Sequence, residues 1–374
     1  MSATTPSTVR QESAQFRETA DGGTHAPTLF GVRAPVDPAA LLAQAQHHRW
    51  SVYDTIETQI AELLRARDPA RAQDEPSRAA AVERHLDGRD PASYGTWVHY
   101  PWTRSLVHVL PRDEYRDLRL SRNRNKIIGA EQRHLSEARI GIVGLSVGFS
   151  IAQTLVLEGI GGQFHLADPD TLCLSNLNRV PAANRDLGVN KAVVAARRLY
   201  EIDPYLSIRV YAEGLTPENV VPFMVDGGSL HLVLEECDDL ATKVRVRGEA
   251  RARRIPVIMD TNDRGLIDIE RFDLEPDRPL LHGLLGDIDP DAVASLTPSD
   301  RIDLLRRFLG RDAMSRRLAE SIDQVGVTLV SLPQLGSGTT IGAGMAADVA
   351  RRVLLSEILS SGRFYADTEL LVCD

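Results

Sequence analysis

The sequence predicts an α/β fold in which helices cover both faces of a doubly wound, mainly parallel sheet, preceded by a helical accessory region. From Arg139 onward, short apolar runs of β type alternate with helical segments. Strands that recur with a helix between them favour parallel pairing, and a mixed α+β sheet is the alternative. The expected strands are Ile140 to Val143, Phe164 to Ala167, Ile208 to Tyr211, Leu232 to Leu234 and Pro256 to Met259. The expected helices lie near Ile151 to Leu157, Lys191 to Tyr200 and Lys243 to Arg253.

The length of 374 residues is enough for one large α/β domain and an accessory element. We expect a disordered, Ser/Thr-rich tail over residues 1–30, an accessory region over 31–118 and the α/β domain over 119–374. In the accessory region, Asp37 is a candidate helix cap and the pattern as far as Leu86 is helical. An aromatic, loop-like stretch follows it.

The C-terminal third has a weaker pattern. After Asp268 a Pro-rich, acidic stretch leads to a helical region from Ile302 to Ile322. The glycines between residues 336 and 344 then predict a flexible turn, followed by a helix over Ala346 to Leu355.

Composition excludes several classes of protein. The net charge of -9 argues against a protein that holds nucleic acid by its phosphates. The uncharged segment from Ile140 to Leu157 is long enough to span a membrane, but glycines and polar residues interrupt it, so no membrane span is expected. No signal peptide is expected, and a reducing cytoplasm fits the cysteine content best. The three cysteines, which include no CxxC pair, are Cys173, Cys237 and Cys373.

A glycine-rich turn joins the first expected strand of the α/β domain to a helix. Its small residues are Gly144, Ser146 and Gly148, and such a turn lets backbone N–H groups and a helix N-terminus approach phosphates, as in a Rossmann-like nucleotide fold. The same residues match GxSxG, the nucleophile elbow of α/β hydrolases, with Ser146 as nucleophile. Chain order does not exclude a hydrolase, because His231 and His282 follow Asp168.

A carboxylate ends the second expected strand, about twenty residues after the turn. A nucleotide fold needs Asp168 in this place to accept hydrogen bonds from ribose hydroxyls. The segment from Asp168 to Arg179 then continues in a way that neither a dehydrogenase nor a hydrolase requires.

That segment reads D-x-D-x(4)-S-N-L-x-R and is followed by Gly188-Val189-Asn190-Lys191. It resembles the signature of the ThiF/MoeB/HesA family of adenylating enzymes, which belongs to the ubiquitin-activating superfamily. The resemblance covers roughly Arg122 to Asp268, with a looser likeness to Leu355. It implies an ATP- and Mg²⁺-dependent adenylyltransferase. The nucleotide-binding residues that it implies are Gly144, Ser146, Gly148, Asp168, Asp170, Asn176, Arg179 and Lys191.

Adenylation transfers AMP to a carboxylate and expels pyrophosphate, so negative charge grows on the bridging and leaving oxygens. Preset cations lower this barrier, and Arg179 and Lys191 suit the task. An arginine in a surface ion pair and a lysine that caps a helix are the structural alternatives.

The run Leu234 to Asp239 offers oxygen ligands at the end of a strand. The resemblance gives Asp238 the position of the Mg²⁺ ligand. Cys237 and Asp239 depart from the Thr and Asn that are usual there, and a solvated acidic loop is the alternative.

The resemblance also implies an arginine finger from an R-x-x-R-Q segment, which often reaches into the partner subunit of a homodimer. Either Arg122 or Arg124 could take this role. Ser146 replaces the second glycine of the family's turn and Phe149 the third. Without CxxC pairs the usual zinc lobe is not expected, and without a cysteine between Cys237 and Cys373 transthiolation is not expected.

The first functional hypothesis is therefore a homodimeric adenylyltransferase that activates the carboxylate of a peptide, a small carrier protein or a biosynthetic intermediate. Asp260 and Arg264, after the last parallel strand, could line the acceptor pocket, or Arg264 could pair with Asp263 or Asp268. Three alternatives remain. They are an NAD(P)-dependent oxidoreductase, a degenerate family member that binds nucleotide and serves as a partner protein, and last the hydrolase, whose motif accounts for five residues only. Neither nucleic acid nor a membrane is expected as a partner.

Overall fold

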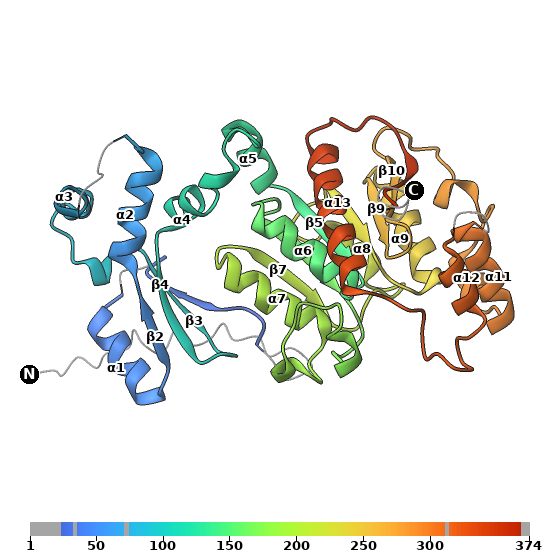
Figure 1. Cartoon of the computed structure of the whole chain (residues 1–374), viewed down its shortest axis with the longest axis horizontal. Helices are drawn as coiled ribbons and strands as arrows, with labels where there is room; N and C mark the ends of the chain where they lie inside the picture. Colours follow the sequence, from blue (N-terminus) through green and yellow to red (C-terminus); the bar gives the residue numbers. More distant parts are fainter. Residues whose placement is uncertain (1–23, 33–35, 71–74, 311–313, 368–374) are drawn as a thin grey trace, which may run out of the picture. The chain divides into compact units, whose positions relative to one another are not determined.

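The computed structural model describes residues 24–32, 36–70, 75–310 and 314–367. The chain divides into two compact units, Met1–Ser121 and Arg122–Asp374, which are described separately here (Figure 1). Of the predicted disordered tail, residues 1–23 lie outside the described residues.

The first unit contains helices, as predicted, and also a sheet that the sequence analysis did not assign. The strand order is β1-β3-β4-β2, with β2 parallel to β4 and the other pairs antiparallel. Its elements are β1 (Thr28–Phe30), α1 (Pro38–His48), β2 (Ser51–Asp54), α2 (Ile56–Arg67), α3 (Glu75–Leu86), β3 (Thr96–Tyr100), β4 (Ser105–Val109) and α4 (Arg112–Arg119).

The expectation of disorder as far as residue 30 is wrong for Thr28–Phe30. This short strand pairs with Trp97 to His99 of β3, and backbone hydrogen bonds to a distant strand order it without any local pattern. Asp37 caps α1 as predicted, because its carboxylate accepts a hydrogen bond from the backbone N–H of Ala39 at 3.0 Å.

The second unit is built on a seven-stranded sheet with the order β11-β10-β9-β8-β5-β6-β7. The five strands from β9 to β7 are parallel, which confirms the doubly wound prediction, whereas β10 and β11 add an antiparallel edge. The strands are β5 (Arg139–Val143), β6 (Gln163–Ala167), β7 (Ser207–Tyr211), β8 (Leu232–Glu235), β9 (Val257–Thr261), β10 (Leu266–Glu270) and β11 (Gly362–Tyr365).

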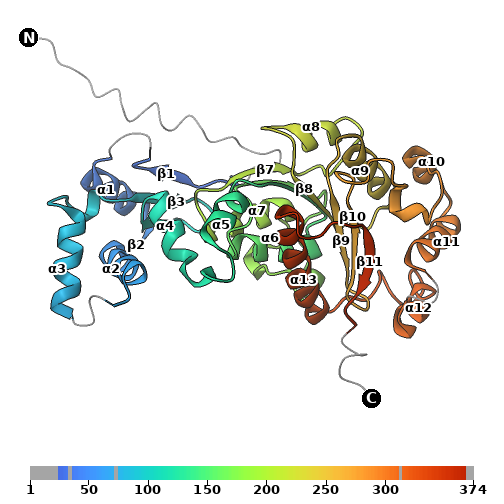
Figure 2. The ribbon, with the colours of Figure 1, turned by 90° about the horizontal axis from the view of Figure 1, so that it is seen from above.

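Helices cover both faces of this sheet. Figure 2 shows α8 and α9 on one side and α6, α7 and α13 on the other. Phe223 of α8 and Val246 of α9 are buried in one apolar cluster with Val233 of β8. The helices of the unit are α5 (Gly129–Ser136), α6 (Val147–Leu157), α7 (Lys191–Ile202), α8 (Val220–Val225), α9 (Leu240–Ala252), α10 (Pro290–Ala294), α11 (Pro298–Leu309), α12 (Arg316–Ile322) and α13 (Gly336–Leu354).

The glycines before Ala346 do not form the predicted flexible turn. The helix α13 already begins at Gly336, and its first turns need glycine for close packing rather than for flexibility. A Cβ on Gly336 would lie 2.7 Å from the carbonyl oxygen of Asn178, and one on Gly342 would lie 2.1 Å from Oδ2 of Asp260. The helix can therefore lie directly on two segments of the site described below.

The apolar segment Ile140 to Leu157 is divided between β5 and α6. Among the described residues, no helix combines the length and the hydropathy that crossing a bilayer requires.

Candidate nucleotide site

The site lies where the strand order reverses. From β5 the chain adds β6 and β7 on one side, and β8 and β9 on the other, so the carboxyl ends of β5 and β8 flank the switch point. Open α/β sheets bind ligands at this crevice. The predicted residues Gly144, Asp168 and Asp238 follow β5, β6 and β8 respectively, so the topology gathers them at one edge of the sheet.

The glycine turn packs against the neighbouring strand end. Gly144 has φ +86, and a Cβ there would lie 2.6 Å from the carbonyl oxygen of Glu236. A Cβ on Gly148 would lie 2.8 Å from Cγ2 of Ile142. Both positions require glycine because the protein itself fills the space, and the N-terminus of α6 is brought to the sheet edge as a result.

Asp168 is 4% exposed and joins two backbone segments. Its Oδ2 accepts a hydrogen bond from the N–H of Leu145 at 2.6 Å, and its Oδ1 accepts one from the N–H of Asp170 at 2.9 Å. Burial raises the pKa of Asp168, while Lys191 acts in the opposite direction. The carboxylate therefore fixes the glycine turn to the end of β6.

Lys191 opens α7 beside the two aspartates. Its Nζ lies 2.7 Å from Oδ2 of Asp170 and 3.9 Å from Oδ1 of Asp168. The cap of this helix is Asn190, whose Oδ1 accepts from the N–H of Ala192 at 3.0 Å. The Nδ2 of Asn190 also donates to the carbonyl oxygen of Asp168 at 2.8 Å. Asn190 thus holds Lys191 at the site, a role that the sequence analysis missed.

Arg179 lies between the glycine turn and the end of β8. Its Nε donates to Oγ of Ser146 at 3.1 Å. Burial lowers the pKa of Arg179, and the charge of nearby Asp238 opposes this shift. Asn176 closes the 3₁₀ turn η4 (Leu174–Asn176), since its Oδ1 accepts from the N–H of Cys173 at 2.9 Å.

The acidic run after β8 divides into residues with different tasks. Asp239 caps α9 and accepts hydrogen bonds from the N–H and the Oγ1 of Thr242 at 2.8 and 2.7 Å. Asp238 is exposed and stays available to a ligand. The described residues contain no group of three or more His, Cys, Asp or Glu side chains that could hold a metal. Mg²⁺ commonly uses one or two carboxylates together with substrate phosphates, so a single Asp238 fits such an ion.

The surroundings of Cys237 favour the protonated thiol over the thiolate. Its Sγ lies 2.9 Å from Oε1 of Glu235. Burial and the negative charge of Glu235 raise its pKa well above the usual value, so the thiolate that nucleophilic chemistry requires is suppressed.

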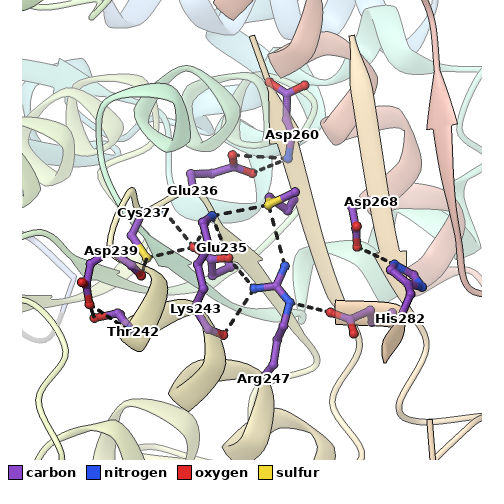
Figure 3. Close-up of polar contacts among 12 residues, drawn as sticks. Glu235, Glu236, Cys237, Asp239, Thr242, Lys243, Arg247, Asp260, Asp268 and His282 are labelled. Carbon is purple, nitrogen blue, oxygen red and sulfur yellow. Dashed lines mark hydrogen bonds and ion pairs between the residues drawn. The ribbon is translucent and has the colours of Figure 1, made fainter. Parts of the chain in front are cut away.

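Glu236, which packs against the glycine turn, and Asp260 are buried neighbours, and Figure 3 shows the carboxylate of Glu236 directed at the backbone of Asp260. The N–H of Asp260 donates to Oε1 of Glu236 at 3.0 Å, whereas neither carboxyl oxygen of Asp260 has a hydrogen-bond partner among the residues that the structure describes. Burial raises the pKa of Asp260 to about 7. The side chain of Asp260, a candidate for the acceptor pocket, lies against Gly342 of α13.

We predict that Asp260→Asn makes the protein more stable than wild type at pH 8, and by less at pH 5. A carboxyl group with a raised pKa contributes stability below its unfolded pKa near 4 and loses it as the pH rises through about 7. A shift of about three pKa units corresponds to about 4 kcal/mol in the free energy of unfolding. Urea unfolding at both pH values measures the stability difference between the variant and wild type. A difference between variant and wild type that does not change with pH would contradict the prediction.

The two candidate finger arginines are not brought to this site within one chain. Arg122 and Arg124 are exposed and flank Asn123, whose Nδ2 donates to the carbonyl oxygen of Glu158 at 2.9 Å. Glu158 follows the last residue of α6, and the glycine turn precedes its first. The 11 residues of α6 separate the two places by about 16 Å at 1.5 Å per residue.

Arg264 bonds to a carboxylate at the C-terminal end of the described residues, and the charge of Asp263, one of the predicted partners, also acts on it. Its Nε lies 2.7 Å from Oδ2 of Asp367, beyond β11, and its guanidinium lies over the ring of Tyr365. It therefore joins the end of β9 to the C-terminal strand.

A buried group of charges supports the end of β8 (Figure 3). Arg247 of α9 is fully buried and bonds to Glu235 and to Glu270, the latter at 2.5 Å from its Nε. Lys243 lies 3.1 Å from both carboxylate oxygens of Glu235. Burial opposes ionisation of Glu235, but the two cations outweigh it and lower its pKa to about 2. Lys243 and Arg247 of α9 thus hold Glu235, which directly precedes the acidic run from Glu236 to Asp239.

The doubly wound sheet, the glycine turn at its switch point and the carboxylates beside it define a Rossmann-like α/β protein. A model of the ThiF family matches residues 120–367, so the chain belongs to the ThiF family. This confirms the resemblance found in the sequence.

Three relatives show how the match is distributed. Uncharacterized protein MT1398 of Mycobacterium tuberculosis is 47% identical over 291 residues, which are 77% of this chain and 40% of that protein. The tRNA threonylcarbamoyladenosine dehydratase of Escherichia coli is 34% identical over 36% of this chain and 49% of its own length. The Sulfur carrier protein adenylyltransferase of Thermus thermophilus is 29% identical over 42% of this chain and 57% of its own length. The chain spans about half the length of the curated relatives it matches.

Proposed function

We propose that the chain is an ATP- and Mg²⁺-dependent adenylyltransferase that activates a carboxylate as an acyl-adenylate and releases pyrophosphate. The observation that carries the proposal is the position of Arg179, Lys191 and Asp238 at the switch point, around a glycine turn that opens a helix. Membership in the ThiF family supports it.

The chemistry asks for positive charge where these residues lie. An oxygen of the acceptor carboxylate attacks the α-phosphorus of ATP, the bond to the bridging oxygen breaks, and pyrophosphate leaves with its electron pair. Arg179 and Lys191 offset the charge that grows on these oxygens, and their positions need no rearrangement during the step. Asp238 would hold Mg²⁺, which would supply further neutralisation of the phosphates when bound.

The remaining predicted residues take supporting parts in this proposal. Asp168 and Asp170 accept from the ribose hydroxyls. Each oxygen of Asp168 already accepts one backbone hydrogen bond but keeps a second lone pair, and Asp170 receives Lys191 on Oδ2 and keeps Oδ1. Asn176 contacts the phosphates. Gly144, Ser146 and Gly148 shape the turn beside them.

The acceptor proposed here carries a free carboxylate on a peptide, a small carrier protein or a small molecule. One relative is named an adenylyltransferase of a sulfur carrier protein, and another is named for a modified tRNA nucleoside, so relatives with this fold differ in substrate. We also propose a cytoplasmic homodimer, in which Arg122 or Arg124 serves the site of the second copy. Their distance from the turn in their own chain supports this arrangement.

Calorimetry with MgATP and, separately, with NAD tests the proposal. We expect binding of MgATP and loss of it in Asp168→Ala. Tight NAD binding without ATP binding would instead favour an oxidoreductase. ATP binding without acyl-adenylate formation from any carboxylate supplied would favour a nucleotide-binding partner protein.

A second prediction concerns the metal. Asp238→Asn should weaken ATP binding about tenfold in the presence of Mg²⁺ and leave binding in EDTA within about twofold, because only the metal-bound complex uses the carboxylate. Asp287→Asn, on a separate surface segment, is the control. Equal losses with and without Mg²⁺ would show that Asp238 does not hold the ion.

A further inference from the structure

The guanidinium of Arg179 is held on two sides by the side chains of Ser146 and Asn178. Ser146 accepts from Nε at 3.1 Å, and Oδ1 of Asn178 accepts from Nη1 at 2.9 Å. The carbonyl oxygen of Ser175 adds a weaker contact to Nη1 at 3.4 Å. Among the described residues, Nη2 makes no hydrogen bond.

Asn178 is itself fixed from a distant part of the chain. Its Nδ2 donates to the carbonyl oxygen of Gln334 at 2.9 Å, just before α13 begins. Its own carbonyl oxygen leaves no room for a side chain at Gly336. The amide of Asn178 therefore bridges the start of α13 and the guanidinium of Arg179.

We infer that Ser146 and Asn178 are positioning residues that orient Arg179 so that Nη2 faces the phosphates. This inference rests on the proposed function, in which Arg179 contacts ATP. This contact explains why a serine stands where the family's turn has a glycine, because glycine has no side-chain oxygen that could accept a hydrogen bond from Nε. Two of the three nitrogens are bound to the protein, and the third is left for a ligand. Orienting the guanidinium in advance lowers the entropy cost of binding.

The first test needs no ligand. In spectra that detect arginine Nε–H groups, the Arg179 signal, identified by its loss in Arg179→Lys, should be visible in wild type and in Ser146→Thr, which keeps the hydroxyl. It should shift or broaden in Ser146→Ala and stay unchanged in the control Ser136→Ala. An unchanged signal in Ser146→Ala would overturn the contact, whatever the protein does with ATP.

The second test is a double-mutant cycle on the affinity for MgATP. Ser146→Ala and Asn178→Ala should each raise Kd about fivefold, and Arg179→Ala about thirtyfold. In the Arg179→Ala background neither change should matter by more than about twofold, since a positioning residue acts only through Arg179. Independent losses in that background would mean direct contact with ATP and would overturn the inference. If wild type does not bind MgATP, the proposed function fails and positioning for ATP fails with it, while the spectra still decide the Ser146 contact.

Discussion

Replacing Arg247 by leucine is expected to lower the free energy of unfolding of the second unit by about 3–5 kcal/mol. Arg247 is fully buried and is the shared partner of Glu235 and Glu270, which are also fully buried. Leucine removes the ion-pair partner of Glu270 and leaves Glu235 with Lys243 alone, in a medium that solvates charge poorly. Breaking a buried ion group from one side costs far more than the group contributes as a whole.

Arg245→Leu provides the matched control, because it changes the same residue type in the same helix. Arg245 pairs at 2.7 Å with Asp291, whose side chain is 81% exposed, so its loss should cost at most about 1 kcal/mol. A double variant, Arg247→Met with Glu270→Gln, leaves Glu235 paired with Lys243 and should regain much of the stability lost by removing the arginine alone. Urea unfolding of the three variants decides the matter, and similar losses for Arg247→Leu and Arg245→Leu would refute it.

Lys191→Ala is expected to weaken MgATP binding by about thirtyfold to a hundredfold, with little change in the fold. The ammonium is 8% exposed and rests 2.7 Å from Asp170, so a nearby phosphate would meet a partly desolvated charge. Removing one member of such a charge pair costs about 2–3 kcal/mol of binding. Calorimetry measures the loss.

Lys126→Ala, an exposed lysine of the same unit, is the control for a general effect of net charge. An unchanged circular dichroism spectrum and unfolding midpoint in Lys191→Ala would show that the fold survives. Should Lys191→Ala bind MgATP as tightly as wild type, the lysine would be a structural partner of Asp170 and no more.

The parallel core was readable from the sequence for a physical reason. All four residues of β8 are buried, and strands covered by helices on both faces appear as continuous apolar runs. By contrast, all four residues of β2 are exposed, so no apolar pattern marks this strand of the first unit. The antiparallel pair β10 and β11 was missed because paired residues such as Leu266 and Tyr365 lie nearly a hundred positions apart.

The site shows the same division. The residue types at Asp168, Arg179 and Lys191 follow from a motif with fixed spacing, and the topology places each at the switch point. The hydroxyl of Ser146 and the guanidinium of Arg179 lie 33 positions apart, and their pairing depends on the path of the intervening chain. The sequence shows Asp260 only as a carboxylate at the end of a strand. The packing of α13 over it, which buries both carboxyl oxygens, is visible only in the structure.

The support of Arg179 by the segment before α13 has a consequence for synthesis of the chain. Asn178 and Gln334 are 156 positions apart, so the arginine leaves the ribosome long before its support does. At about 5–20 residues per second, the delay is about 8–30 s. During that interval the strands from β5 to β9 can already form their sheet. The parallel strands can therefore pair before Asn178 meets Gln334, whereas α13 and β11 are added to the fold only afterwards.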